Sequence, residues 1–425
     1  MPGMMFGTML LCFALSVSVA VSIGLASLGG VLMSGSLPLV VVPKEMFSSL
    51  DKFPLLAVPF FVLAGKLMEE GGISQRLVEF ARALVGGIQG GLALSCVLTC
   101  LIFAAVSGSS VATTFAVGSI LIPALVRMGY PTNWAASLQA TSAELGVIVP
   151  PSVPMILYGV AAEVSIGEMF VAGIGPGVLI AGALMLYVLI WARVTGMGKR
   201  DGEGRLALWV AGRNAFWALM MPVIILGGIY GGIFTPTEAS AVAVVYAVLV
   251  GLFVYKGLSW RALPRVLRQS AVTTSVIMFI IMNAGLFSYL VNYAGIPETL
   301  GHYLQETLKT PMNFLLGVNL ALFLIGMFVE TGAAIIVLAP ILAPVAVFFG
   351  IDPVHFGLIV IVNLALGMIT PPVGVNLFAA CAVARIPLDQ LVKPLLPFVG
   401  VVILCLGLIS AVPEISLTLR DAVFR

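Results

Sequence analysis

Charged side chains are scarce in this 425-residue chain: only 9% of its residues are Asp, Glu, Lys or Arg, against about 25% in an average soluble domain. A soluble protein of this length could not cover its surface with so few charges. Their scarcity excludes a cytosolic enzyme, a secreted domain and a nucleic-acid binder. With 61% hydrophobic residues and spans of about 20 residues each, we expect an integral membrane protein with about 10 to 13 membrane segments.

Histidine and cysteine are also rare, with two and five copies. The cysteines all lie in apolar runs, where such residues pack as small hydrophobic side chains, and two histidines make a zinc site improbable. The chain has no GxxxxGK[ST] sequence for ATP phosphates and no HExxH sequence. We therefore expect no enzyme activity and no cofactor.

No lysine or arginine precedes Lys44. A secretory signal begins with basic residues, so we expect the apolar stretch from Met4 to Val42 to be retained. It is too long for one span and should hold two, broken near Gly29-Gly30 or near Ser34-Gly35-Ser36.

Two basic clusters predict the orientation, because basic loops stay on the cytoplasmic side. Two apolar segments, 215–234 and 237–255, separate the clusters, so both clusters fall on one face and the turn at 234–238 on the other. Residues 259–269 read as a short interfacial basic helix, or as an ordinary cytoplasmic loop. The clusters comprise Arg193, Lys199, Arg200, Arg205 and Arg213, and Lys256, Arg261, Arg265 and Arg268.

An internal repeat is the most informative feature of the sequence. At an offset of 221 residues, Val149-Pro150-Pro151-Ser152 resembles Thr370-Pro371-Pro372-Val373. The same offset pairs Pro123 with Pro344, Gly129 with Gly350 and Pro176 with Pro397. An ordered series of this kind predicts two related halves.

A Pro-Pro pair inside an apolar segment removes two backbone donors and breaks the helix. Such a break is tolerated in a membrane only inside the protein or beside a water-filled cavity. It leaves carbonyls and half-helix ends free to hold an ion or an anionic group. Matching interruptions in two halves are a pointer to a transporter's binding site.

Upstream of each break lies a turn of small residues, Ser107 to Ser110 and Glu330 to Ala334. We expect each turn to be the tip of a re-entrant helical hairpin that joins its break to form an oxygen cage for sodium. Tight helix packing is the alternative role for these small residues. The first cage would comprise Ser107, Ser109, Ser110, Gly146, Val149 and Pro151, and the second Thr331, Gly332, Gly367, Thr370, Pro372 and Val373.

Ionisable residues in apolar surroundings are functional candidates, and Glu144 and Glu330 are two of them. Glu330 could instead accept hydrogen bonds at the hairpin tip. Ser152 and Asn376 lie just past the breaks and could contact a substrate. A repeat-built membrane protein without an ATP site is most simply a secondary transporter.

Several runs carry a resemblance to a known family: Ser107-Gly-Ser-Ser-Val-Ala-Thr-Thr, Val149-Pro-Pro-Ser-Val-Pro-Met-Ile-Leu-Tyr-Gly, Thr235-Pro-Thr-Glu-Ala and Met368-Ile-Thr-Pro-Pro-Val-Gly-Val-Asn. From about Pro59 to Pro397 the chain resembles the large membrane subunit of TRAP (tripartite ATP-independent periplasmic) transporters. The resemblance implies an all-helical inverted-repeat protein of the bacterial inner membrane.

The resemblance also implies partners and a mechanism. Such subunits pair with a small four-helix membrane subunit and receive substrate from a periplasmic binding protein. They import organic acids such as C4-dicarboxylates, keto acids or sialic acid, driven by sodium. An elevator movement, in which a transport domain slides against a scaffold, is the mechanism the resemblance implies.

For this chain the implied transport domain comprises 88–172 and 310–393. The implied scaffold comprises 1–87, 173–309 and the C-terminal span at 394–425, with arm helices at 74–84 and 297–308. The resemblance also carries sodium ligands onto the serine turn and break of the first half, and onto Gly332, Thr370 and Val373. Here the second tip has Glu330-Thr331 in place of a serine-rich copy, so the two ion sites need not be equivalent. A stand-alone sodium/carboxylate symporter and, from another class, a membrane-embedded enzyme or scaffold remain as alternatives.

Overall fold

The computed structural model describes residues 2–35, 37–198 and 206–424, and this part of the chain is helical without any strand. Seven helices are long and apolar enough to cross a membrane, or up to ten if each bent helix pair counts as one span. The chain is thus a polytopic membrane protein. Of the first basic cluster, Lys199, Arg200 and Arg205 lie outside the described residues.

The first half of the chain holds eleven α-helices and one short 3-10 helix among its described residues. In order they are α1 (Pro2–Ala14), α2 (Val19–Ser34), α3 (Val41–Leu50), η1 (Phe53–Leu56), α4 (Ala57–Glu70), α5 (Ile73–Val85), α6 (Gly91–Ser107), α7 (Ser110–Arg127), α8 (Thr132–Ala143), α9 (Leu145–Ile148), α10 (Val153–Ala161) and α11 (Ile166–Thr195).

The second half begins with a pair of spans and ends with a short C-terminal helix. Its elements are α12 (Leu208–Tyr230), α13 (Pro236–Leu249), η2 (Val250–Val254), α14 (Leu263–Tyr293), α15 (Ile296–Leu308), α16 (Pro311–Gly326), α17 (Thr331–Phe348), α18 (Pro353–Met368), α19 (Val375–Ala384), α20 (Leu388–Ala411) and α21 (Glu414–Phe424).

Side-chain caps explain why several helices begin where they do. Thr235 and Glu238 form a capping box at the start of α13. The Thr235 hydroxyl accepts the Glu238 backbone N–H, and the Glu238 carboxylate accepts the Thr235 backbone N–H. Ser109 caps α7 and Ser165 caps α11 in the same way. The polar residues of these turns therefore position the helices that follow them.

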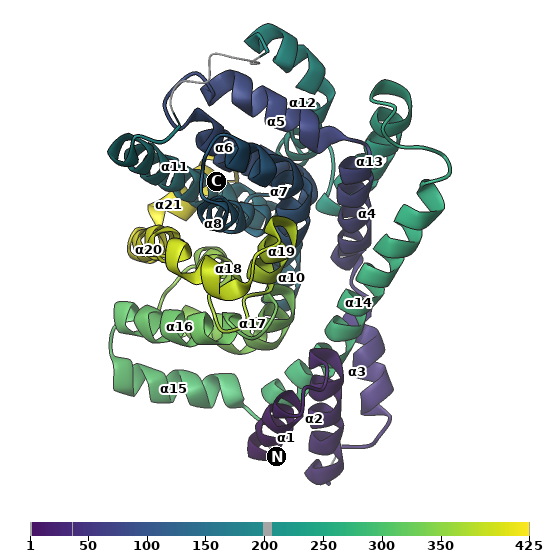
Figure 1. Ribbon diagram of the computed structural model, residues 1–425. Coiled ribbons are helices and arrows are strands. Elements are labelled where there is room, and N and C mark those ends of the chain that lie inside the picture. Colours follow the sequence, from purple (N-terminus) through teal and green to yellow (C-terminus); the bar gives the residue numbers. More distant parts are fainter. Residues whose placement is uncertain (1, 36, 199–205, 425) are drawn as a thin grey trace.

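The helices form two groups, which Figure 1 shows side by side. Helices α6 to α11 and α16 to α20 pack on one another in a bundle, while α1 to α4, α13 and α14 form a second, elongated group. The groups touch where α4 meets α6 and where α14 meets α17. Helix α5 packs between α6 and α12, and α15 packs on α17, so both predicted amphipathic stretches are helices beside the bundle.

Helix α11 gives a reference direction for the bundle. At its C-terminal end, the Gln89 amide donates to the Ala192 carbonyl at 3.0 Å, and Trp134 stacks on Trp191 with ring centroids 4.0 Å apart. Helices α6 and α8 therefore begin at this end of α11. Helix α18 begins at the opposite end of α11, beside Glu168.

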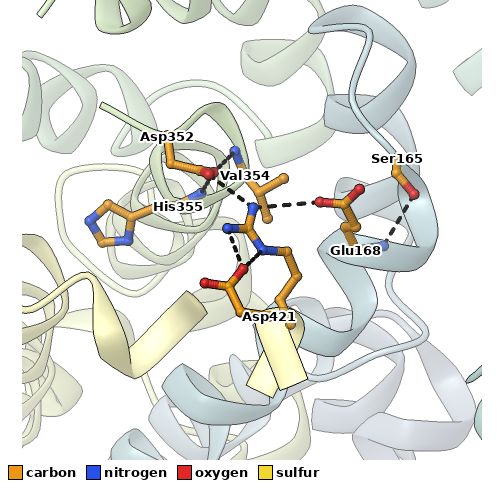
Figure 2. Close-up of polar contacts among 7 residues, drawn as sticks. Ser165, Glu168, Asp352, Val354, His355 and Asp421 are labelled. Atoms are coloured by element: carbon orange, nitrogen blue, oxygen red, sulfur yellow. Dashed lines mark hydrogen bonds and ion pairs between the residues drawn. The ribbon is translucent and has the colours of Figure 1, made fainter. Parts of the chain in front are cut away.

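A buried arginine on the C-terminal helix α21 joins the start of α18 to the N-terminal end of α11 (Figure 2). The Arg420 guanidinium is 2% exposed and contacts the carboxylates of Asp352 at 2.9 Å, Asp421 at 2.7 Å and Glu168 at 3.5 Å. Asp352 also caps α18 by accepting the backbone N–H groups of Val354 and His355. Burial alone would raise the pKa of the Asp352 carboxyl, but the bonds from Arg420 and the backbone outweigh it and lower this pKa below its usual value.

The expectations about helix boundaries are met in part. The N-terminal apolar stretch has an additional break at residues 15–18. Gly29-Gly30 lies inside α2, but α2 ends at Ser34 with Gly35 as its C-cap, which is the second of the two predicted positions. The stretch 259–269 is no separate interfacial helix, because its residues from Leu263 onward form the first turns of the 31-residue α14. Helix α21 follows α20 as a separate element, fixed by the Arg420 contacts.

Candidate functional site

Two tight turns in the bundle match the predicted hairpin tips. The first tip, Gly108–Ser109, joins α6 to α7, and the second tip, Met327–Glu330, joins α16 to α17. Two interruptions match the predicted helix breaks: the first break, Val149–Ser152, separates α9 from α10, and the second break, Ile369–Gly374, separates α18 from α19. The helices on either side of the first break are bent by 44°.

The first tip lies directly against the first break. A Cβ atom on Gly108 would lie 2.8 Å from the carbonyl oxygen of Pro151. One on Gly146 would lie 2.7 Å from the Ser109 carbonyl oxygen and 2.9 Å from the Thr113 hydroxyl. Only glycine therefore fits at position 146, and oxygens from the tip crowd around it.

Hydroxyl groups connect the residues of this first cluster. The hydroxyls of Ser107 and Thr113 are 3.0 Å apart, and the Thr113 hydroxyl donates to the Ser109 carbonyl at 2.7 Å. Ser110 is 1% exposed, and its hydroxyl lies beside the Glu144 carboxylate. The structure thus brings together the predicted set of Ser107, Ser109, Ser110, Gly146, Val149 and Pro151. Thr113, which the sequence analysis did not include, belongs to the same cluster.

The second tip lies against the second break in a related way. The Gly374 N–H donates to the Met327 carbonyl at 3.2 Å, and the Thr331 hydroxyl contacts the Met368 sulfur at 2.8 Å. A Cβ atom on Gly367 would lie 2.4 Å from the carbonyl carbon of Gly326. Gly367 follows Gly146 at the repeat offset of 221, so equivalent glycines make the close approach in both halves.

The two clusters differ in their access to solvent. Residues Val149 to Ser152 are all buried, whereas Thr370 and Val373 are half-buried and Pro372 is exposed. The Thr370 hydroxyl donates to the Leu366 carbonyl at 2.7 Å, which leaves its oxygen free to accept or coordinate. Gly332, the remaining member of the second set, lies beside the Glu330 carboxylate and Leu157.

The two residues predicted to contact substrate are both completely buried. The Ser152 hydroxyl donates to the Val147 carbonyl at 2.6 Å, across the first break. The Asn376 amide donates to the Glu144 carboxylate at 2.8 Å and to the Ala140 carbonyl at 3.0 Å, and its oxygen accepts from Thr114 at 2.6 Å. Both side chains therefore have protein partners, and their contact with a substrate stays a prediction.

A cavity of about 1490 Å³ separates the two helix groups at the hairpin tips. Residues of both tips line it, among them Ser109, Ser110, Glu330 and Gly332. Its other wall comes from α2, α4 and α14 and includes Lys66, Glu69 and Arg268. Arg268 belongs to the second basic cluster, so the cavity extends from the tips to the N-terminal part of α14.

Glu330 occupies the tip position where the first half has Ser109. Its carboxylate accepts the Ala333 N–H at 3.1 Å and so caps α17, as the Ser109 hydroxyl caps α7. The predicted hydrogen-bonding role of Glu330 at the tip is confirmed. Its side chain also lines the cavity.

Comparison with known proteins gives the chain its family. The family model described as "Tripartite ATP-independent periplasmic transporter, DctM component" matches residues 6–415. A C4-dicarboxylate TRAP transporter large permease protein of Rhodobacter capsulatus is 40% identical, with 98% of each chain covered. A sialic acid TRAP transporter large permease protein of Vibrio cholerae is 36% identical, covering 99% of this chain and 98% of the relative.

Among solved structures, the YdaH transporter of Alcanivorax borkumensis has a similar fold. It has a TM-score of 0.67 at 16% identity, with 90% of this chain and 89% of the other covered. The match to the family model extends over nearly the whole chain, and both relatives are covered almost end to end. The chain therefore belongs to the tripartite ATP-independent periplasmic transporters, as a large permease component of the DctM type.

Proposed function

We propose that the chain imports a small organic anion, of the C4-dicarboxylate, keto acid or sialic-acid type, by sodium-coupled secondary transport. The observation that carries this proposal is the pair of hairpin tips that line one cavity, each tip packed against a helix break. Each cluster offers hydroxyl and carbonyl oxygens, the donors that hard cations prefer. Half-helix ends and unwound carbonyls are the usual sodium ligands of secondary transporters.

The donor set fits sodium as a coupling ion. The first set would use the hydroxyls of the serine turn with carbonyls near Gly146, Val149 and Pro151. The second would use Thr331 or Gly332 with Thr370 and carbonyls near Gly367, Pro372 and Val373. Among the described residues, no group of three or more His, Cys, Asp or Glu side chains is placed so that it could hold a metal ion, so these sites would rest on oxygens from the turns and the breaks.

We propose an inverted repeat from the directions of the helices and an elevator mechanism from the position of the cavity. The hairpin and broken helix of the first half begin at one end of α11, and α18 begins at the other end. This opposition supports two halves of inverted topology. The cavity between the two helix groups supports a bundle that moves against α1 to α4, α13 and α14, with α5 and α15 as connecting arms.

The family is tripartite by description. We therefore propose that the chain works in the bacterial inner membrane with a small four-helix membrane subunit. A periplasmic binding protein would deliver the substrate. Lys66 and Arg268 on the cavity wall could each pair with a carboxylate group of an anion, although Glu69 and Glu330 line the same cavity.

Uptake into vesicles tests this function. The chain, its small subunit and a loaded binding protein should accumulate labelled C4-dicarboxylate, keto acid or sialic acid only under an inward sodium gradient. Equal uptake in potassium alone would refute the coupling. Equal uptake without the binding protein would favour a stand-alone symporter of similar architecture.

A further inference from the structure

Glu144 differs from the other charged side chains of the bundle. Only Glu144 and Arg420 are both charged and buried among the described residues, at 3% and 2% exposure. Arg420 has three carboxylates around it, whereas Glu144 forms no ion pair with any described residue. An ionised carboxylate without a cation costs several kcal/mol when buried, so Glu144 must either bind a cation or take up a proton.

The polar atoms around Glu144 leave a gap on one side. One carboxylate oxygen accepts the Asn376 amide at 2.8 Å, but the other, Oε2, is buried without any hydrogen-bond partner. The buried hydroxyl of Ser110 lies beside the same carboxylate and interacts with it. Ser110 is the first residue of α7, so the open side of Glu144 faces the first tip.

We propose that Glu144 supplies the fixed negative charge of the first sodium site and that Asn376 transmits its occupancy to the second. This inference rests on the proposed sodium coupling and adds two residues outside the tip-and-break oxygens. A sodium ion between the tip oxygens and Oε2 would give the Glu144 carboxylate a cationic partner. It would also neutralise the only buried acid of the described bundle.

Asn376 connects this charge to the other half of the molecule. It is the second residue of α19, immediately after the second break. Its amide group has both hydrogens and its oxygen engaged with α7 and α8, through Thr114, Ala140 and Glu144. An ion that fixes the Glu144 carboxylate therefore also fixes the start of α19, and with it one wall of the second site.

The Glu144–Asn376 pair occurs in only one of the two orientations that the repeat would allow. At the offset of 221, Ala365 stands where the first half has Glu144, and Met155 corresponds to Asn376. The first site therefore has a charge that the second lacks. We expect sodium to bind the first site more tightly and to favour binding at the second, because the link runs through the Asn376 amide.

Sodium-dependent thermal stability of the purified protein tests the proposal without requiring transport. The melting temperature is measured against sodium concentration at constant ionic strength, with potassium as the replacement ion. Glu144→Gln should raise the half-saturating sodium concentration at least about tenfold, a loss of about 1.4 kcal/mol. Asn376→Ala should keep the response but lower its cooperativity toward a Hill coefficient of one.

Asn363→Ala is the matched control. Asn363 is a fully buried asparagine of the same bundle, bonded to Asn319 at 2.7 Å and absent from the lining of the cavity at the tips. Its loss should lower the melting temperature and leave the sodium dependence unchanged. A wild-type sodium curve for Glu144→Gln, or for Asn376→Ala if the first variant does not fold, overturns the proposal. A wild-type protein without any sodium response removes the proposed coupling as well, which distinguishes the two failures.

Discussion

At the scale of single residues, two glycines fix how closely each tip approaches its break. A methyl group on Gly146 would collide with a backbone carbonyl and a hydroxyl of the first tip. We predict that Gly146→Ala raises the sodium half-saturation for uptake by about tenfold or more, because the tip oxygens must move apart by several tenths of an ångström.

The control for this substitution is Gly182→Ala. Gly182 is an exposed helical glycine of α11 with nothing within 4 Å of an added Cβ atom. Alanine at such a position favours the helix by roughly 1 kcal/mol. Unchanged sodium dependence in Gly146→Ala would show that the close approach serves packing alone.

Thr370 offers a second prediction at this scale. Its hydroxyl donates to the carbonyl four residues earlier, so valine removes the coordinating oxygen while keeping the shape of the side chain. Thr370→Val should weaken sodium dependence by on the order of 1 kcal/mol, about fivefold in half-saturation, and Thr370→Ser should restore it. Thr418→Val removes a hydroxyl with the same bonding pattern from α21 and should change neither value.

The residue scale also shows where sequence reasoning stops. Both glycines were predicted because they lie shortly before the Pro-Pro breaks, and the serine turn was predicted because it is a run of small residues upstream of the first break. The bond between Asn376 and Glu144 spans 232 residues and follows no repeat, so no local pattern could have shown it. Thr113 was missed because a threonine one turn past a tip resembles any helix-packing residue.

At the scale of helices, the breaks and tips were predictable because proline and small residues limit what the backbone can do. Interfaces between helices were harder to predict. The basic residues at the start of α14 suggested a separate helix, yet the backbone continues without interruption to Tyr293. The C-terminal helix was not predicted as a separate element. Its position depends on Arg420, whose partners Glu168 and Asp352 are distant in the sequence.

Helix α21 leads to a prediction about stability. Arg420→Met should lower the melting temperature, with a loss on the order of 2 kcal/mol, because three carboxylates lose a buried donor. Arg265→Met, which removes the exposed contact to Glu70, should cost at most about 1 kcal/mol. Equal melting temperatures for the two variants would contradict a structural role for the buried network.

The same network has a defined dependence on pH. The pKa of Asp352 lies below its ordinary value in the folded protein. Its contribution to stability is therefore complete above the unfolded pKa of about 4 and disappears as the pH falls through the lower folded pKa. Asp352→Asn should lack this contribution at neutral pH, so thermal melting of the two proteins should converge in acid.

At the scale of the whole molecule, the two helix groups meet over limited contacts and enclose the cavity. One contact joins the Lys52 ammonium, at the start of η1, to the Val160 carbonyl in α10 at 3.5 Å. If the bundle moves against the other group, joining Lys52→Cys to Val160→Cys with a short bismaleimide should arrest uptake. The background for this test is a chain whose five native cysteines are replaced.

Each single-cysteine variant, treated with the same reagent, should continue to transport. Full uptake by the cross-linked double variant would show that this contact persists throughout the cycle.

The fold class could be predicted from composition alone, since few charges and long apolar runs permit little else. The division into two groups could not be predicted from the residues alone, because helices of both groups are equally apolar.

The single acid buried in the bundle has an electrical consequence. In the proposed elevator cycle, Glu144 would cross the bilayer with the empty bundle, either as a carboxylate or neutralised by a proton, and only the carboxylate would respond to the membrane voltage. Moving one elementary charge through the whole field changes the energy by about 2.3 kcal/mol per 100 mV. Because the cell interior is negative, the membrane voltage would push the empty, anionic bundle outward and so hasten the return step of each cycle.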